Sequence, residues 1–240
     1  MRPSRATVRD AGGQRGAALI IMAVILVMGS AYVLVSRLNA NQALWEHNRE
    51  TADLLGQARA ALIGYALETG CLPCPSASAT SGVAQASCAA AGQRVGFLPW
   101  LTLDLPGLDS WDHRLRYSVT PAFAQGTCSF DETTDGDIRV ETRDAAGSLT
   151  NLTTTAPAVL VSHGHNGYGA FTANGAAIGN PPGAHVDENT NRTGATSFVQ
   201  RGTTTEPGAA GGPFDDIVVW LPVSRLCQHL ATKMGGWTCP

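Results

Sequence analysis

Charged side chains are scarce in this chain of 240 residues, and no recognised catalytic motif is present. Asp, Glu, Lys and Arg together make up 15% of the residues, and the formal net charge is only −3. Nucleic-acid-binding proteins concentrate positive charge on one face, so the composition argues against DNA or RNA as a partner. The G-x-S-x-G, P-loop, G-x-G-x-x-G and H-E-x-x-H patterns are all missing. We therefore expect a protein that is not an enzyme.

Residues Ala17 to Val35 form a run of nineteen consecutive positions without a charge, and most of them are apolar. A helix of that length, at a rise of 1.5 Å per residue, is roughly 28 Å long and matches the ~30 Å hydrocarbon core of a bilayer. The leader before it contains four arginines and a single acid, Asp10. Because basic flanks stay cytoplasmic, we expect one membrane pass, with everything after Arg37 exported.

A cleaved secretory signal is the alternative interpretation of this segment. Gly29, Ser30 and Ala31 offer the small residues that a conventional signal peptidase accepts. The apolar run is, however, longer than the usual 7 to 15 residues of such signals. It also does not end in a turn, which favours a helix that continues.

Helical periodicity extends past the apolar run. No proline occurs between Ser36 and Gly70. Apolar residues recur there at intervals of three, four or seven, which predicts one helix of about fifty residues with an apolar stripe that docks on a soluble domain. The residues of this stripe are Leu38, Trp45, Ala52, Leu55, Ala58, Leu62 and Ala66.

The part after Gly70 has a different composition, since most of the 27 glycines and 13 prolines lie in it together with many Thr and Ser residues. This pattern predicts strands and long loops. We divide the chain into a basic leader (1–16), a transmembrane helix (17–36), its amphipathic continuation (37–69) and an exported, globular, β-rich domain (70–240). The expected fold class is α+β, with the long helix packed on a small antiparallel β-sheet.

The junction between leader and helix resembles that of type IV pilin-like subunits, including the pseudopilins of type II secretion. Gly16 followed by an apolar run looks like the site where prepilin peptidase cuts, which would leave Ala17 as a methylated N terminus. Most members of that family have a glutamate at the fifth mature position, where this chain has Ile21. In the resembling systems, subunits without this glutamate are minor ones that initiate or cap a filament. The resemblance implies a non-catalytic minor pilin or pseudopilin.

That resemblance also implies partners and a location. The partners would be other pilins or pseudopilins, the prepilin peptidase and an inner-membrane assembly platform. The location would be the bacterial inner membrane, with the C-terminal domain in the periplasm or at a filament tip. The alternative is a signal-anchored periplasmic domain, binding or hydrolytic, that never polymerises.

All six cysteines follow the apolar run, and an even number on the exported side predicts disulfides. Six positions allow fifteen pairings, so the connectivity stays open, with Cys88 able to take Cys71 or Cys74. A bond between the last two cysteines would close the C-terminal tail. The C-x-x-C spacing at the start of the domain also suits a redox or zinc site. The cysteines are Cys71, Cys74, Cys88, Cys128, Cys227 and Cys239.

Two segments, Val159–Ala170 and Phe214–Pro222, look like the pair that surrounds a bound calcium in pseudopilins. Four residues in them have side-chain oxygens, which calcium prefers: Ser162, Asn166, Asp215 and Asp216. Calcium is therefore a candidate cofactor, although Asn166 replaces the family's aspartate. The alternative is a tight turn at Asn166-Gly167 that Asp216 caps or hydrogen-bonds. The spacing of His163 and His165 also suits a zinc ligand pair, but a third ligand would have to come from His113, His185 or an aspartate, and nothing in the sequence fixes which.

Two further segments complete the expectations. Asn174 to Gly212 is poor in large apolar residues, so we expect a long loop that contacts a partner or a ligand. Ile217–Leu221 is an apolar run before Pro222 and predicts a strand near the centre of the sheet, followed by a short terminal helix.

Overall fold

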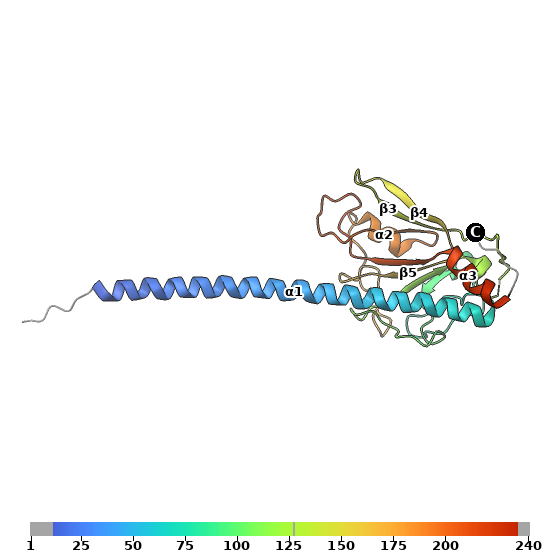
Figure 1. Cartoon of the computed structure of the whole chain (residues 1–240), viewed down its shortest axis with the longest axis horizontal. Coiled ribbons are helices and arrows are strands. Elements are labelled where there is room, and N and C mark those ends of the chain that lie inside the picture. The colour runs from blue at the N-terminus through green and yellow to red at the C-terminus, as the bar shows by residue number, and fades with distance from the viewer. Residues whose placement is uncertain (1–11, 127, 235–240) are drawn as a thin grey trace, which may run out of the picture. The chain divides into compact units, whose positions relative to one another are not determined.

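The computed structural model describes residues 12–126 and 128–234 (Figure 1). The chain forms two compact units, Met1–Glu46 and His47–Pro240, and the boundary falls inside the first helix. The elements follow in the order α1 (Gly12–Thr69), β1 (Val95–Phe97), β2 (Arg116–Val119), β3 (Ile138–Arg143), β4 (Leu149–Ala156), β5 (Ala158–Ser162), α2 (Val186–Thr193), β6 (Ser197–Val199), β7 (Ile217–Leu221) and α3 (Val223–Met234). Two short 3₁₀ turns, Ala91–Gln93 and Pro121–Phe123, precede β1 and follow β2.

Helix α1 is a single helix of 58 residues, which confirms the predicted continuity from the apolar run to Thr69. It ends where Gly70 takes a positive φ of 85° and donates its N–H to the carbonyl of Ala66. Glycine reaches this left-handed conformation without steric cost, so it is the usual residue just beyond a helix.

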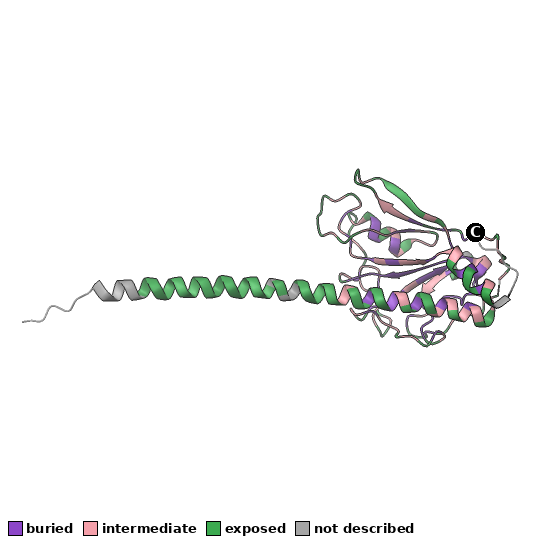
Figure 2. Cartoon of the chain, in the orientation of Figure 1, coloured by how far each residue is buried: buried purple, intermediate pink, exposed green. Residues whose placement is uncertain are grey.

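The first unit exposes the apolar part of α1. From Leu19 to Val35 every large apolar side chain is between 49% and 75% exposed, and Figure 2 shows this stretch as continuously exposed. Among the described residues, α1 is the one helix long and apolar enough to cross a membrane. Exposed apolar surface of this extent is unfavourable in water, so the segment needs lipid or other helices around it.

The second unit uses the last part of α1 as a core helix. The predicted stripe is confirmed from Leu55 onward, since Leu55, Ala58, Leu62 and Ala66 are fully buried. It is wrong before that point: Leu38 and Trp45 belong to the first unit and are 54% and 75% exposed. Ala52 is also exposed. Thr51 and Leu54 are buried in its place, because they lie three or four residues from Leu55 and Ala58 and so share their side of the helix.

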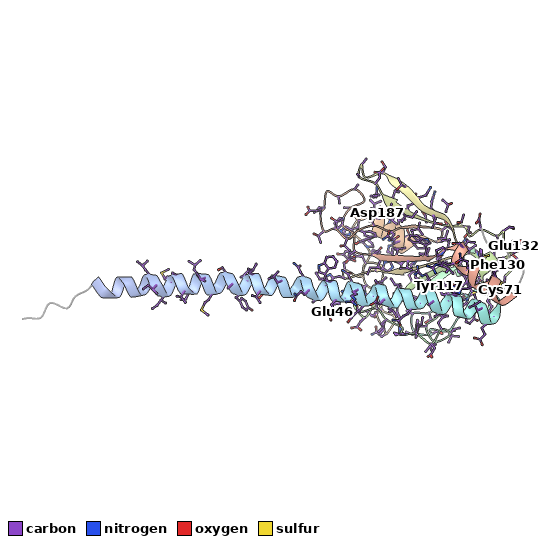
Figure 3. All side chains as sticks on the ribbon, in the orientation of Figure 1. Glu46, Cys71, Tyr117, Phe130, Glu132 and Asp187 are labelled. Atoms are coloured by element: carbon purple, nitrogen blue, oxygen red, sulfur yellow. A yellow bond between two sulfur atoms is a disulfide. The ribbon has the colours of Figure 1, made fainter. Side chains whose placement is uncertain are left out.

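A four-stranded antiparallel sheet with the order β1-β2-β5-β7 lies at the centre of this unit. Tyr117 pairs with Leu160, and Leu160 with Val219, so their side chains point to one face, where the larger core cluster joins them to α1 and α3. Tyr117 is fully buried (Figure 3), and its hydroxyl donates to the carbonyl of Pro73 over 3.1 Å. The strand β7 was expected near the centre, but it forms an edge, because β5 pairs with both β2 and β7.

A second, three-stranded sheet with the order β4-β3-β6 covers the opposite face. Its β3–β4 pair is antiparallel and its β3–β6 pair is parallel. Val140 and Phe198 from this sheet pack against Val159, Val161 and Val218 of the first sheet. In Figure 1, α2, β3 and β4 lie on the side of β5 opposite to α1. The α+β class and a long helix packed on a small antiparallel sheet are confirmed, but the second, mixed sheet was not expected.

The second sheet was missed because part of it comes from the segment predicted as a loop. Residues 174–212 contain both α2 and β6, so they are not one long loop. Helix α2 buries Asp187, Glu188 and Asn191, each at most 1% exposed. Its buried face is therefore polar, and a search for apolar periodicity does not detect such a helix.

Two disulfides close the beginning of the second unit, Cys71–Cys128 and Cys74–Cys88. The bond of Cys88 to Cys74 is one of the two options expected for Cys88. Each cysteine of the C-x-x-C motif has a distant partner, so no redox dithiol or zinc pair remains there. Cys227 is buried and disulfide-bonded. Its expected partner, Cys239, lies outside the described residues.

Candidate functional site

Three carboxylates converge where α2 meets the start of β7. One oxygen each of Glu188, Asp215 and Asp216 lies within 4.8 Å of the other two. Glu188 is 0% and Asp216 is 3% exposed, while Asp215 is half-buried. Among the described residues, this is the one place where three or more acidic, histidine or cysteine side chains converge in this way. Three carboxylates at such distances repel one another unless protons or a cation neutralise them.

Asp215 has the clearest unsatisfied atom of the three. Its Oδ2 accepts the backbone N–H of Asn166 over 2.8 Å, whereas its Oδ1 is buried and has no hydrogen-bond partner. Burial raises the pKa of this carboxyl to about 8, and the charges of Glu188 and Asp216 contribute in the same direction. A buried carboxylate oxygen without a partner costs free energy, and a bound cation would remove that cost.

Asp216 is held by two side chains. Its Oδ1 lies 3.3 Å from Nδ1 of His163, and its Oδ2 accepts a hydrogen bond of 2.8 Å from Nδ2 of Asn191. Burial is the largest cause that raises the pKa of Asp216, and the charge of Glu188 adds to it, while His163 and Asn191 oppose the rise. These two contacts hold the Asp216 side chain in position, but they do not offset the cost of a buried negative charge beside Glu188.

Glu188 enters the cluster from α2. Its Oε1 accepts hydrogen bonds from Nδ2 of Asn166 over 2.8 Å and from the backbone N–H of Asp215 over 3.2 Å. Its Oε2 lies 2.7 Å from Nδ1 of His185, one helical turn away in the same segment. Sequence reasoning missed Glu188, because it lies in the segment predicted as a loop. The acids in the first turn of α2, Asp187 and Glu188, were the signal that could have revealed a helix start.

A buried ion pair fixes α2 over the cluster. Arg143 of β3 donates from Nε and Nη2 to the two carboxylate oxygens of Asp187, over 2.8 Å and 2.6 Å. Arg201 donates from Nε to the same carboxylate over 2.7 Å. Asp187 is labelled in Figure 3. Gly211 passes so close that a Cβ would lie 1.9 Å from an oxygen of Asp187, and its φ of 82° also favours glycine.

The four residues predicted to bind calcium are only partly brought together. Asp215 and Asp216 lie in the cluster, and Asn166 contacts both Asp215 and Glu188. Ser162 is directed elsewhere, since its hydroxyl donates to Oδ2 of Asp109 over 2.6 Å and accepts the N–H of Gly164. The alternative of a capped turn is also present in part: Gly167 has a φ of 64°, but the carboxylate that accepts the N–H of Asn166 is that of Asp215 and not, as expected, that of Asp216.

The donor chemistry of the cluster fits a hard divalent cation. Calcium binds six to eight oxygens from carboxylates, amides, carbonyls and water, and three carboxylates next to an amide supply the charged part of such a set. The buried free oxygen of Asp215 is the specific observation in favour. The expected pair of histidines is not formed as a ligand pair, because His163 is 1% exposed whereas His165 is exposed.

The residues of the predicted processing site lie in α1. Gly16, Ala17 and Ile21 all fall within its helical range, and Ile21 is 59% exposed. Position 21 therefore places an aliphatic side chain on the exposed apolar surface of the helix, where the resembling family has a carboxylate.

No protein-family model matches the chain, and neither a curated protein nor a solved structure shows significant similarity to it.

Proposed function

We propose that this chain is a non-catalytic minor pilin or pseudopilin, which initiates or caps assembly of a type IV pilus or a type II secretion pseudopilus. The observation behind the proposal is α1, one continuous helix whose large apolar side chains from Leu19 to Val35 are exposed and whose last part is built into a folded core. A subunit of this kind can leave the bilayer and enter a helical bundle without refolding.

The exposed part of α1 has the residues that close helix packing requires. In lipid, helices associate through van der Waals packing and satisfied polar groups, and small residues allow their backbones to approach. Gly29 has no heavy atom within 4 Å of the position of a Cβ, and the hydroxyl of Ser30 donates to the carbonyl of Val27 over 2.9 Å. The segment thus offers a small-residue surface without an unsatisfied side-chain donor.

Ile21 supports the role of a minor subunit. A carboxylate in the hydrocarbon core costs at least a few kcal/mol, and in a major subunit the terminal amine of a neighbour would neutralise it. A subunit with isoleucine at this position needs no such neighbour. It can therefore occupy the end of a filament, where one neighbour is missing.

The carboxylate cluster would hold a structural calcium ion in this proposal. Glu188, Asp215 and Asp216 would be its ligands, and the ion would supply positive charge that joins α2 to the start of β7. The partners would be other pilins or pseudopilins, the prepilin peptidase and an inner-membrane assembly platform. The chain would lie in the bacterial inner membrane with its C-terminal domain in the periplasm.

Photo-crosslinking in the native host tests the assembly role. A photoreactive amino acid replaces Ile25, which is 65% exposed on α1, and a matched control replaces Leu149, which is 45% exposed on β4. We expect adducts from position 25 with the N-terminal helices of other pilin-like subunits, and their loss in a strain without the prepilin peptidase. Adducts with lipid alone, or identical adducts in both strains, would contradict the proposal and favour an anchored domain that does not polymerise.

A further inference from the structure

A small cavity lies on the face of the central sheet opposite to α1. It has a volume of about 260 Å³ and is lined by residues from β1, β2 and the loop after β5, among them Phe97, Arg114, Arg116, His163 and Phe171. A second cavity of about 230 Å³ shares Arg116 and the segment 169–171 with the first and extends to Arg192 of α2. The two cavities are therefore neighbours with a partly shared wall, and we call them together the arginine pocket.

The strand register explains why these side chains meet. Phe97 pairs with Arg116, and Arg116 pairs with Val161, so all three point to the same face of the sheet. His163 lies two residues beyond Val161 and therefore continues on that face. The face holds the smaller core cluster around Val159, Val161 and Val218. The arginine pocket therefore lies on the same face of the sheet as this apolar cluster.

Three arginines surround the pocket, and none of them has an acidic partner among the described residues. Arg114 donates to the carbonyls of Gly107 and Ala173 and lies 4.0 Å from the ring centre of Trp100. Arg116 donates from Nη2 to the carbonyl of Gly194. The partner of Arg192 is the side-chain amide of Asn189. The arginines of the second unit that do pair with an aspartate are Arg94, Arg143 and Arg201.

Buried polar atoms of the residues that line the pocket remain without a partner. The Nε atoms of Arg114 and Arg116 and Nε2 of His163 are buried and have no hydrogen-bond partner in the described chain. His163 is itself only 1% exposed. Burial, and secondarily the charge of Arg192, lowers the pKa of Arg116 to about 10, so the guanidinium is still charged at neutral pH but poorly compensated. Buried polar groups in native proteins are generally paired, so an unpaired set of this kind indicates a missing ligand.

We propose that the arginine pocket binds a small organic oxyanion, a carboxylate or phosphate attached to an apolar body. Guanidinium groups match both oxyanions in geometry and charge. The apolar body would lie against Phe97 and Phe171, whose rings meet edge to face with centres 5.0 Å apart. Each of the two cavities is smaller than those that hold drug-sized molecules, which limits a ligand in either one to about the size of one ring. Binding of such a ligand does not depend on whether the chain enters a filament.

Calorimetric titration of the full chain in a neutral detergent and a chloride buffer tests the proposal. The probes are phenyl phosphate, benzoate and inorganic phosphate, with benzyl alcohol as the uncharged control. We expect phenyl phosphate or benzoate to bind with a dissociation constant below about 1 mM, and inorganic phosphate about tenfold more weakly because it lacks the apolar body. Which of the two aryl probes binds more tightly identifies the oxyanion. No saturable binding of either one, or equal binding of benzyl alcohol, would overturn the proposal.

Substitutions locate the binding within the chain. Arg116→Met should weaken binding of the better probe at least tenfold, whereas Arg139→Met removes an exposed arginine of the other sheet and should leave it unchanged. The thermal midpoint without ligand verifies that each variant folds. If Arg116→Met fails to fold, Arg192→Met replaces it, because this side chain lies at the rim and should weaken binding at least threefold. Unchanged binding in the folded variant would place the probe elsewhere and contradict the assignment.

Discussion

Replacing Asp215 with Asn should make the metal-free protein more stable at pH 8 and abolish its stabilisation by calcium. The pKa of Asp215 is about 8 in the folded chain against an ordinary value of 3.8. The folded state therefore keeps a proton that the unfolded state releases near pH 4, so the free energy of unfolding falls as the pH rises from 4 to 8. One pKa unit corresponds to about 1.4 kcal/mol, so this carboxyl costs the metal-free protein on the order of 5 kcal/mol at pH 8.

The variant removes that cost because Asn is neutral at every pH and has nearly the same shape. Its oxygen can still accept the N–H of Asn166, and its amide can donate to the remaining carboxylates. We expect wild-type stability without metal to decline between pH 5 and pH 8, and that of Asp215→Asn to decline much less. Calcium at 100 times its dissociation constant should add about 2.7 kcal/mol to the wild type at pH 8 and nothing to the variant.

Urea unfolding of the full chain in detergent, followed by tryptophan fluorescence, measures both effects, since urea is uncharged and does not screen the cluster. The series needs EDTA, calcium and magnesium at pH 5 and pH 8. Glu206→Gln, which removes an exposed carboxylate of the same unit, is the matched control and should behave as the wild type. The reasoning fails if the metal-free variant is no more stable than the wild type at pH 8, or if calcium stabilises both proteins equally.

Two further predictions concern what holds the second unit together. Asp187→Ala leaves two arginines unpaired at a site where the carboxylate is 1% exposed, and should lower the free energy of unfolding by about 3–5 kcal/mol; a loss below 1 kcal/mol in the same urea assay would show that the ion pair does not fix α2. Removing the bond Cys71–Cys128, with 57 residues of separation, should cost about 4 kcal/mol, and removing Cys74–Cys88, with 14, about 3 kcal/mol. Paired Cys→Ser variants measure this order, and a larger loss for the shorter loop would contradict the loop-entropy argument.

The elements with strong apolar periodicity were predictable from the sequence. The end of α1 at Thr69, the strand β7 and the helix α3 all lie where the pattern places them. Their signals are local, since an apolar period of 3.6 or 2 and a following glycine or proline are enough to detect them. The position of β7 at an edge was not predictable, because strand order depends on long-range pairing that periodicity does not encode.

The candidate site was predictable only in part. Asp215, Asp216 and Asn166 were proposed because their two segments resemble the pair that surrounds calcium in pseudopilins and because their side chains have oxygens, which calcium prefers. Glu188 was not accessible to this reasoning, since α2 buries polar side chains that bond to one another and to the arginines of distant strands. A helix of this kind has no apolar stripe, and only the folded structure shows which charges compensate which. The arginine pocket was missed for the same reason, since its residues come from four separate segments.

The mass of the mature N-terminal peptide, measured on protein from the native host with and without active prepilin peptidase, tests the central claim most directly. The proposal predicts an N-methylated terminus at Ala17 in the presence of the peptidase and an unprocessed leader in its absence. An intact Met1 in both strains, or a terminus near Tyr32, would contradict the proposal, because the apolar segment would then be a permanent anchor or an ordinary secretion signal.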